Sequence, residues 1–260
     1  DFKTQSSITN QYDVVFVLDA SSSMAGAKMT NMTQAVNDVI DVLLPENDDM
    51  DDIYNRVAIV TFNSDAVHSG WTEEGDTLGI GESTMSHATN IQGGLYEARI
   101  LLNSRRSNAT PVIILLSDGA PNRHAAYNFS TGTPDWNYGT PFDSYGADNS
   151  AAYTILYAKW LKTQIANLKI FTVGFDIDSA PRAKAVLNIT APSSDILNEM
   201  DAAKTVTGFD PGDDYNYADA AYLATLSNLS EILPSLTGSI SSGGPIVSDS
   251  DLVITDIIPT

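Results

Sequence analysis

Four short segments of the chain are continuously apolar, and they alternate with longer segments in which apolar residues recur every three or four positions. Continuous runs rich in Val, Ile and Phe are typical of strands buried on both faces of a parallel sheet. The predicted strands are Val14–Leu18, Val57–Phe62, Val112–Leu116 and Ile170–Phe175. The three-to-four spacing predicts amphipathic helices over Lys28–Leu44, Ile91–Leu102, Ala151–Leu168 and Asp219–Leu236.

This alternation of strands and helices predicts an α/β fold with a doubly wound, mainly parallel central sheet and helices on both faces, as in Rossmann-like domains. The stretch "SDAVHSGW", residues 64–71, predicts one short antiparallel strand at the edge of the sheet. In sheets of this kind, ligands bind beyond the carboxyl ends of the strands. Polar residues that directly follow a predicted strand are therefore the first candidates for a functional site.

The pattern also predicts how the chain is divided. We expect a lead-in segment over residues 1–12, one large domain over 13–237 with an insertion at 124–150, and a linker with the start of a neighbouring β-rich domain over 238–260. Gly and Ser dominate the stretch Thr237–Pro245, as is typical of linkers. Because the chain begins with Asp1 and "VITDIIP" near its end reads as a beginning strand, we expect a segment of a longer protein.

Charge and composition limit the classes of partner and of metal site that we expect. The 260 residues include 13 Lys and Arg against 33 Asp and Glu, a net charge of −20. Such a chain repels phosphate backbones and anionic lipids, so we expect no nucleic-acid partner and no direct membrane contact. The absence of cysteine excludes disulfides and thiolate metal sites. The acidic run "ENDDMDD", Glu46–Asp52, favours a solvated turn over a calcium loop, because it lacks the regular ligand spacing.

Oxygen-bearing side chains follow three of the predicted strands or precede the helices next to them. Asp19, Ser21 and Ser23 end the first strand, Thr89 precedes a helix, and Asp118 follows another strand. Carboxylates and hydroxyls are ligands for a hard divalent cation, which keeps some of its waters. The sequence therefore predicts a Mg²⁺ site, with Mn²⁺ or Ca²⁺ as alternatives. The competing interpretation is a rim of helix-capping Ser, Thr and Asp side chains.

Three motifs in this order, "DVVFVLDASSSM", "TNIQGGL" and "VIILLSDGAPN", resemble the von Willebrand factor A-type domain with a complete metal-ion-dependent adhesion site. The resemblance covers roughly Tyr12 to Leu236. It implies that Asp19, Ser21 and Ser23 are first-loop ligands, Thr89 the second-loop ligand and Asp118 the third, some of them through water. Ser22 stands where the family usually has glycine, which we expect to cause no loss of metal binding.

The insertion His124–Ser150 is rich in aromatic residues, Gly and Asn, and its root adjoins Asp118. A loop of this length is usually functional, and aromatic rings among small polar residues suit a recognition surface; a self-packed decoration is the alternative. The residues we expect to contact a ligand are His87, Asn90, His124, Tyr127, Trp136, Tyr138 and Tyr145. Asp176 and Asp178 follow the last predicted strand and are expected to tune the local field.

Two other kinds of chemistry have weaker support. A zinc site that uses His87 and His124 is conceivable, but their scattered spacing favours solvent-exposed histidines. No P-loop, HExxH motif, nucleophile elbow or cysteine nucleophile is present, and a hidden hydrolase would need one of these two histidines as its base. We therefore expect a binding protein and not an enzyme.

Within the family, the cysteine-free acidic chain and the aromatic insertion resemble Gram-positive pilus-tip and cell-wall surface adhesins. This resemblance implies an extracellular domain, on the cell surface or a pilus, that captures an acidic group of a host or matrix protein through its cation. Two alternatives remain: an assembly module whose ion only stabilises the loops, and an intracellular chaperone-type A domain that works with an ATPase.

Overall fold

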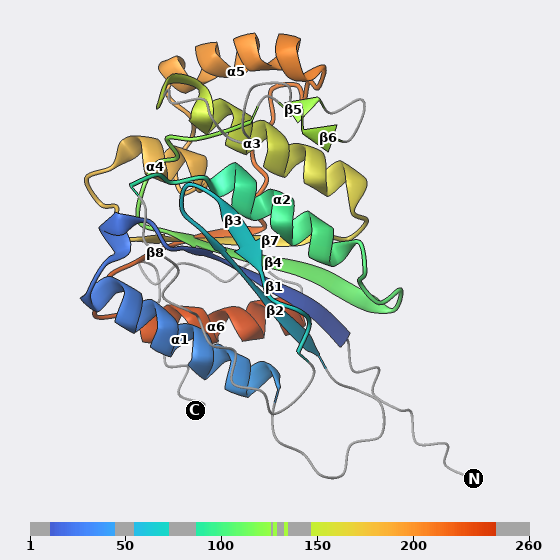
Figure 1. The fold of residues 1–260 in the computed structure, drawn as a ribbon, viewed down its shortest axis with the longest axis vertical. Helices are drawn as coiled ribbons and strands as arrows, with labels where there is room; N and C mark the ends of the chain where they lie inside the picture. The colour runs from blue at the N-terminus through green and yellow to red at the C-terminus, as the bar shows by residue number, and fades with distance from the viewer. Residues whose placement is uncertain are drawn as a thin grey trace, which may run out of the picture.

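The computed structural model describes residues 11–44, 55–72, 87–125, 127–128, 133–134 and 147–242. Its centre is a six-stranded sheet in the order β3-β2-β1-β4-β7-β8 (Figure 1). The strands are β1 (Gln11–Asp19), β2 (Arg56–Phe62), β3 (Ala66–His68), β4 (Ala109–Ser117), β7 (Lys169–Phe175) and β8 (Ala220–Ala224). Only β3 runs antiparallel to its neighbour in this sheet. The predicted fold class and the antiparallel edge strand are confirmed.

Helices cover both faces of the sheet (Figure 1). They are α1 (Ala27–Leu43), α2 (Ile91–Leu102), α3 (Ala147–Gln164), α4 (Pro181–Val186), α5 (Ser194–Thr207) and α6 (Leu229–Ser242). Helices α1 and α6 share a core with Val14, Phe16 and Leu18 of β1, whereas α2 and α3 share one with Val15 and Val17. Alternate residues of β1 are thus buried on opposite faces, which explains its continuous apolar run.

The C-terminal part differs from the predicted helix Asp219–Leu236. Residues Ala220–Ala224 form strand β8 beside β7, and α6 begins only at Leu229. The apolar residues at the start of this stretch fit a helical stripe, but Leu223 and Leu226 remain 38% and 42% exposed. The backbone of this stretch pairs with β7 instead. Helix α6 also continues through Gly238 to Ser242, inside the stretch that we expected to be a linker.

Helix boundaries elsewhere shift by a few residues. Helix α3 begins four residues before the predicted Ala151 and ends at Gln164, because Asn167 turns the chain with a left-handed backbone (φ 59°) before β7. Helices α4 and α5 were not predicted from the sequence. A small antiparallel pair, β5 (Tyr127–Asn128) and β6 (Thr133–Pro134), lies within the predicted insertion. The acidic run Glu46–Asp52 lies outside the described residues.

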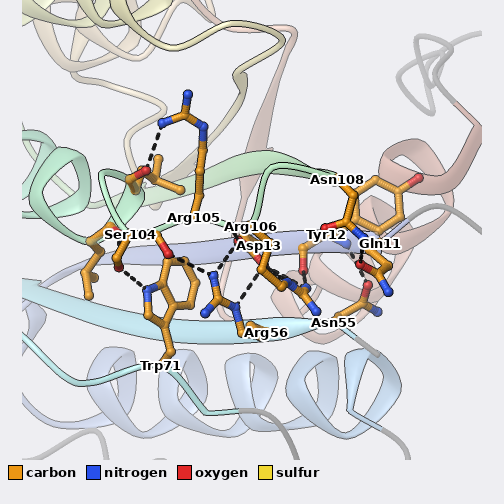
Figure 2. Close-up of polar contacts among 12 residues, drawn as sticks. Gln11, Tyr12, Asp13, Asn55, Arg56, Trp71, Ser104, Arg105, Arg106 and Asn108 are labelled. Carbon is orange, nitrogen blue, oxygen red and sulfur yellow. Dashed lines mark hydrogen bonds and ion pairs between the residues drawn. The ribbon is translucent and has the colours of Figure 1, made fainter. Parts of the chain in front are cut away.

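The amino-terminal end of β1 is held by a buried ion cluster (Figure 2). The Asp13 carboxylate is fully buried and binds Arg56 Nη2 at 2.7 Å and Arg106 Nη2 at 2.7 Å. The Arg106 backbone N–H donates to the same carboxylate at 2.7 Å. The guanidinium of Arg56 lies over the Trp71 ring, and the Trp71 indole donates to Ser104. This cluster joins β1, β2 and the approach to β4 at the end of the sheet opposite Asp19.

Candidate metal centre

The first candidate loop begins where β1 ends. Asp19 is fully buried, and its Oδ1 accepts a hydrogen bond from the Ser21 backbone N–H at 2.8 Å. A short 3-10 turn, Ser22–Met24, follows, with Met24 buried beneath it. Gly26 then adopts φ 77°, a conformation that favours glycine, and leads into α1. The turn brings the Ser21 and Ser23 hydroxyls to 2.9 Å of each other.

The third candidate loop contacts the first directly. Asp118 follows β4, and its Oδ1 accepts a hydrogen bond from the Ser23 hydroxyl at 2.7 Å. The Ser117 hydroxyl donates to Asp19 Oδ2 at 2.5 Å, so the last residue of β4 also bonds to the first loop. The structure therefore joins four of the five predicted metal ligands into one network: Asp19, Ser21, Ser23 and Asp118.

Thr89, in the second candidate loop, does not bond to this network. Its backbone N–H donates to Asn122 Oδ1 at 2.8 Å, and the Asn122 N–H donates to the Thr89 carbonyl at 3.1 Å. These two bonds tie the second loop to the loop that carries Asp118. Within the described chain, the Thr89 hydroxyl makes no hydrogen bond to the other four residues, and the residue is buried.

The electrostatics of the network favour a cation. Burial raises the pKa of Asp19 to about 6; hydrogen bonds from Ser117 and Ser21 oppose this rise, and the nearby charge of Asp118 adds to it. A desolvated carboxylate next to a second carboxylate is destabilised unless positive charge is close. Two carboxylates with three hydroxyls form an all-oxygen donor set, which fits a hard divalent ion such as Mg²⁺. The residues present therefore fit the predicted ion.

This donor set depends on its hydroxyls. Among the residues that the structure describes, no three His, Cys, Asp or Glu side chains gather as a metal-binding group. His87 is exposed, and its Nδ1 lies 3.1 Å from the Ser22 hydroxyl on the first loop. His124 bonds elsewhere, so the described residues give no support to the zinc alternative that pairs these two histidines.

Two of the residues expected to contact a ligand have structural roles instead. Asn90 is fully buried; its Oδ1 caps α2 by accepting from the Gly93 N–H at 2.9 Å, and its Nδ2 donates to the Ser64 carbonyl. His124 is 7% exposed, lies 2.9 Å from the Ser150 hydroxyl and stacks on Tyr153 at 4.3 Å between ring centroids. The burial of both residues gives no support to the expected ligand contacts, and the expectation that His124 is exposed is wrong.

The structure says little about the other residues that we expected to contact a ligand. Tyr127 is the first residue of β5 and pairs with Pro134, whereas Trp136, Tyr138 and Tyr145 lie outside the described residues. Asp176 and Asp178 are exposed after β7, and the nearest cation to Asp178 is Lys184 at 3.8 Å.

Two residues that contact the predicted ligands, Ser117 and Lys28, were not predicted from the sequence. Ser117 directly precedes Asp118, and a polar residue that ends an otherwise apolar strand was an available signal. Lys28 is the second residue of α1, and its Nζ lies 2.7 Å from Asp118 Oδ2. A lysine among the exposed residues of a helix carries no comparable signal, because its partner is 90 residues away.

Comparison with known proteins supports the resemblance over part of the chain. Residues 14–120 match the von Willebrand factor type A domain family, which is the class that the three motifs resemble. Among curated proteins, human inter-alpha-trypsin inhibitor heavy chain H2 is 32% identical over 116 residues. The match covers 42% of this chain and 12% of that protein, so this chain matches only a small part of its curated relative.

Solved structures share the fold over most of the chain. The von Willebrand factor domain of the type V pili tip protein Mfa5 from Porphyromonas gingivalis has a TM-score of 0.60 and 18% identity, covering 93% of this chain and 99% of that one. The pilus adhesin SpaC from Lactobacillus rhamnosus GG, in an open conformation, has a TM-score of 0.52 and 17% identity, covering 90% of this chain and 30% of that one.

A third similar structure carries a metal. Proximal thread matrix protein 1 from the mussel byssus, with a zinc-occupied adhesion-site motif, has a TM-score of 0.50 and 16% identity and covers 90% of this chain and 46% of that one. At these identities the likeness establishes the fold alone. In this chain, none of the helices that the structure describes is long and apolar enough to cross a membrane.

Proposed function

We propose that this chain is a metal-dependent adhesion domain of a bacterial surface or pilus protein. In this proposal, a divalent cation bound at the carboxyl end of the sheet captures an acidic group of a host or matrix protein. The family match over residues 14–120 and the fold shared with pilus proteins support this class of function. One of those proteins is a pili tip protein and the other a pilus adhesin, which supports an extracellular location for this domain.

The observation that carries the proposal is the bonded network around the buried Asp19 carboxylate. Asp19 has no cationic partner among the described residues, although its charge is fully removed from water. A buried charge of this kind is normally paired or coordinates a metal. Ser21, Ser23 and Asp118 lie in the same network, and the second loop adjoins it through Asn122.

The residues divide the proposed task among them. Asp19 and Asp118 supply the negative charge that holds a dication, and Ser21, Ser23 and Thr89 supply neutral oxygens. When bound, a divalent ion supplies a strong positive centre that accepts a carboxylate oxygen. Because three of the five donors are neutral, the protein donates at most two negative charges, so a dication would keep attraction for an acidic partner. His87, exposed beside Ser22, lies where it can contact such a partner.

Calorimetric titration of Mg²⁺ and Mn²⁺ into the metal-free protein tests the first half of the proposal. The wild type is expected to bind one ion, and Asp19→Asn, which keeps the side-chain shape but removes the charge, is expected to bind none. Asp178→Asn is the matched control, because it removes one charge from an exposed carboxylate at the same end of the sheet. It should bind the ion as the wild type does.

Binding to immobilised collagen, fibrinogen and fibronectin, with Mg²⁺ or with EDTA, tests the second half. Retention that is lost with EDTA and in Asp19→Asn, but kept in Asp178→Asn, supports metal-bridged capture. Retention that is equal in EDTA contradicts it. Uptake of the ion without retention on any extracellular protein would instead favour an assembly module whose ion stabilises the loops.

A further inference from the structure

The contact that holds Lys28 against Asp118 has a consequence for metal binding. Asp118 has both carboxylate oxygens occupied, with Ser23 on Oδ1 and the Lys28 ammonium on Oδ2, each at 2.7 Å. The Asp118 side chain is fully buried, and that of Lys28 is 25% exposed. Within the described part of the chain, Lys28 is the cation that the structure pairs with the five-residue donor set.

The position of Lys28 is unfavourable for the helix that carries it. It is the second residue of α1, and the first turn of α1 contains no acidic residue to offset it. The amino end of a helix has a partial positive charge, which disfavours a lysine there. The ion pair with Asp118, 90 residues away in sequence, offsets this repulsion. The ion pair with Asp118, and not the intrinsic preference of the helix terminus, therefore explains a lysine at this position.

An ammonium and a divalent ion that share the Asp118 carboxylate repel each other, and the burial of that carboxylate reduces the screening of this repulsion by water. Lysine differs from a fixed ligand in this respect, because its charge sits on a flexible four-carbon stem and can move away into water. The partly exposed Lys28 side chain, above a fully buried carboxylate, has that route open.

We propose that Lys28 is an internal counter-cation that neutralises Asp118 in the metal-free site and competes with the divalent ion, thereby setting the affinity of the site for metal. This inference rests on the proposed function, because it takes the five predicted ligands as the metal site. Entry of the ion breaks the Lys28–Asp118 pair, and loss of the ion allows it to reform. The lysine thus stabilises the empty site and weakens the filled one.

The test compares metal affinity in variants of one residue. Lys28→Met keeps most of the length and apolar stem but removes the charge, and Lys28→Gln is a second neutral variant. Calorimetric titration with Mn²⁺ and Mg²⁺ is expected to show a Kd at least tenfold lower in both variants than in the wild type. Lys28→Arg keeps a cation at this position and should stay near the wild-type Kd.

A remote lysine controls for the overall change in charge. Lys162 pairs with Asp219 at 2.7 Å, and Asp219 bonds to the first residues of β7 at the other end of the sheet. Lys162→Met removes the same charge from the chain, and its Kd for Mn²⁺ should lie within twofold of the wild type. An equal gain of affinity in Lys162→Met and Lys28→Met would overturn the inference.

Thermal unfolding gives a readout that needs no bound metal. In EDTA, Lys28→Met should have a lower Tm than the wild type, because Asp118 loses its counter-charge, and saturating Mn²⁺ should remove the difference. If the wild type binds metal but the Kd is unchanged or raised in both neutral variants, the inference is overturned and the proposed function is not. Absence of metal uptake in the wild type and in Lys28→Met overturns this inference and the proposed function together.

Discussion

Asp19 has the least favourable environment of the site carboxylates in the metal-free protein. Burial raises its pKa from 3.8 to about 6, so the folded protein holds this proton more tightly than the unfolded chain does. The stability that the protonated carboxyl contributes is present below pH 4 and is lost as the pH rises through 6. The loss amounts to about 3 kcal/mol at pH 7. The residue that we propose as a metal ligand is thus expected to destabilise the fold when no metal is bound.

Asp19→Asn should therefore stabilise the metal-free protein while it removes metal binding. The neutral side chain avoids the cost of burying a charge, and urea unfolding in EDTA at pH 7 should show a gain of about 1–3 kcal/mol. The gain should shrink toward pH 5, where the wild-type carboxyl becomes protonated. A variant that is destabilised in EDTA would contradict the pKa assigned to this buried carboxyl.

His124 provides the opposite pH dependence. Burial lowers its pKa from 6.5 to about 4, so the unfolded chain binds the proton more tightly than the folded protein. The stability due to the neutral imidazole is present above pH 6.5 and is lost as the pH falls toward 4. This group should make the fold about 2 kcal/mol less stable at pH 5 than at pH 7.

Urea unfolding at a series of pH values measures that loss. Relative to the wild type, His124→Gln should raise the free energy of unfolding at pH 5 by about 2 kcal/mol more than it does at pH 7, because no group at this position then titrates. His87→Gln is the matched control, since His87 is exposed beside Ser22, and it should follow the wild-type profile. Equal slopes in His124→Gln and the wild type would show that His124 is not the group responsible.

Helix α2 depends on a glycine for its approach to the sheet. A methyl group on Gly94 would lie 2.8 Å from side-chain atoms of both Phe62 and Val17, closer than packed carbon atoms approach. Gly94→Ala should therefore cost about 1–3 kcal/mol through overpacking. Gly238→Ala is the control, because a methyl group there meets nothing within 4 Å and α6 should gain up to about 1 kcal/mol in helix propensity. Chemical unfolding of the two variants should shift in opposite directions.

Elements buried on both faces were the ones that the sequence predicted well. The strands β1, β2, β4 and β7 each contain a short run of mostly apolar residues rich in Val, Ile and Phe, and runs of this length and composition favour a buried strand over a helix. Strand β8 was not predicted, because Ala220–Ala224 is short and lies at the edge of the sheet. A helical spacing of apolar residues fits this stretch equally well. Helix α5 was missed although Ser193 and Gly208 cap its two ends, which are signals in the sequence.

The site was predictable to the extent that its residues follow strands. The Asp and Ser positions after β1 and β4 were predicted, and the structure joins them in one network. The burial of Asn90 and His124 depends on partners at Ser64 and Ser150, which no local pattern connects to them. The contact of Lys28 with Asp118 likewise depends on where the start of α1 lies relative to the loop after β4, and not on any spacing along the chain.

Seen as a whole, the domain combines a net charge of −20 with a site that we propose binds an acidic partner. Charges separated by more than about 8 Å are largely screened at physiological ionic strength, so a partner at the site feels mainly the local charges. There the negative charge comes from Asp19 and Asp118, which a dication would offset. The acidic surface then disfavours anionic partners everywhere except at the ion, which favours one defined place of contact.

The buried aspartates at the two ends of β1 have different roles, one in stability and the other in the proposed function. Asp13 and Asp19 lie six residues apart, about 20 Å along the strand, and both are fully buried. Burial alone would raise the pKa of Asp13, but hydrogen bonds from Arg56 and Arg106 hold it below its usual value. Asp13 is thus a paired carboxylate that joins three segments of the sheet, whereas Asp19 has no cation among the described residues.

Asp13→Asn should therefore destabilise the protein without changing its affinity for metal. It leaves two partly buried guanidinium groups without their counter-charge, which should cost about 3–5 kcal/mol in urea unfolding. Asp214→Asn is the control, because its exposed ion pair with Lys159 should contribute less than about 1 kcal/mol. Calorimetry of the folded Asp13→Asn protein should give the wild-type Kd for Mn²⁺. A raised Kd would mean that the ion cluster and the metal site act as one unit, because strain at one end of β1 would then reach the other.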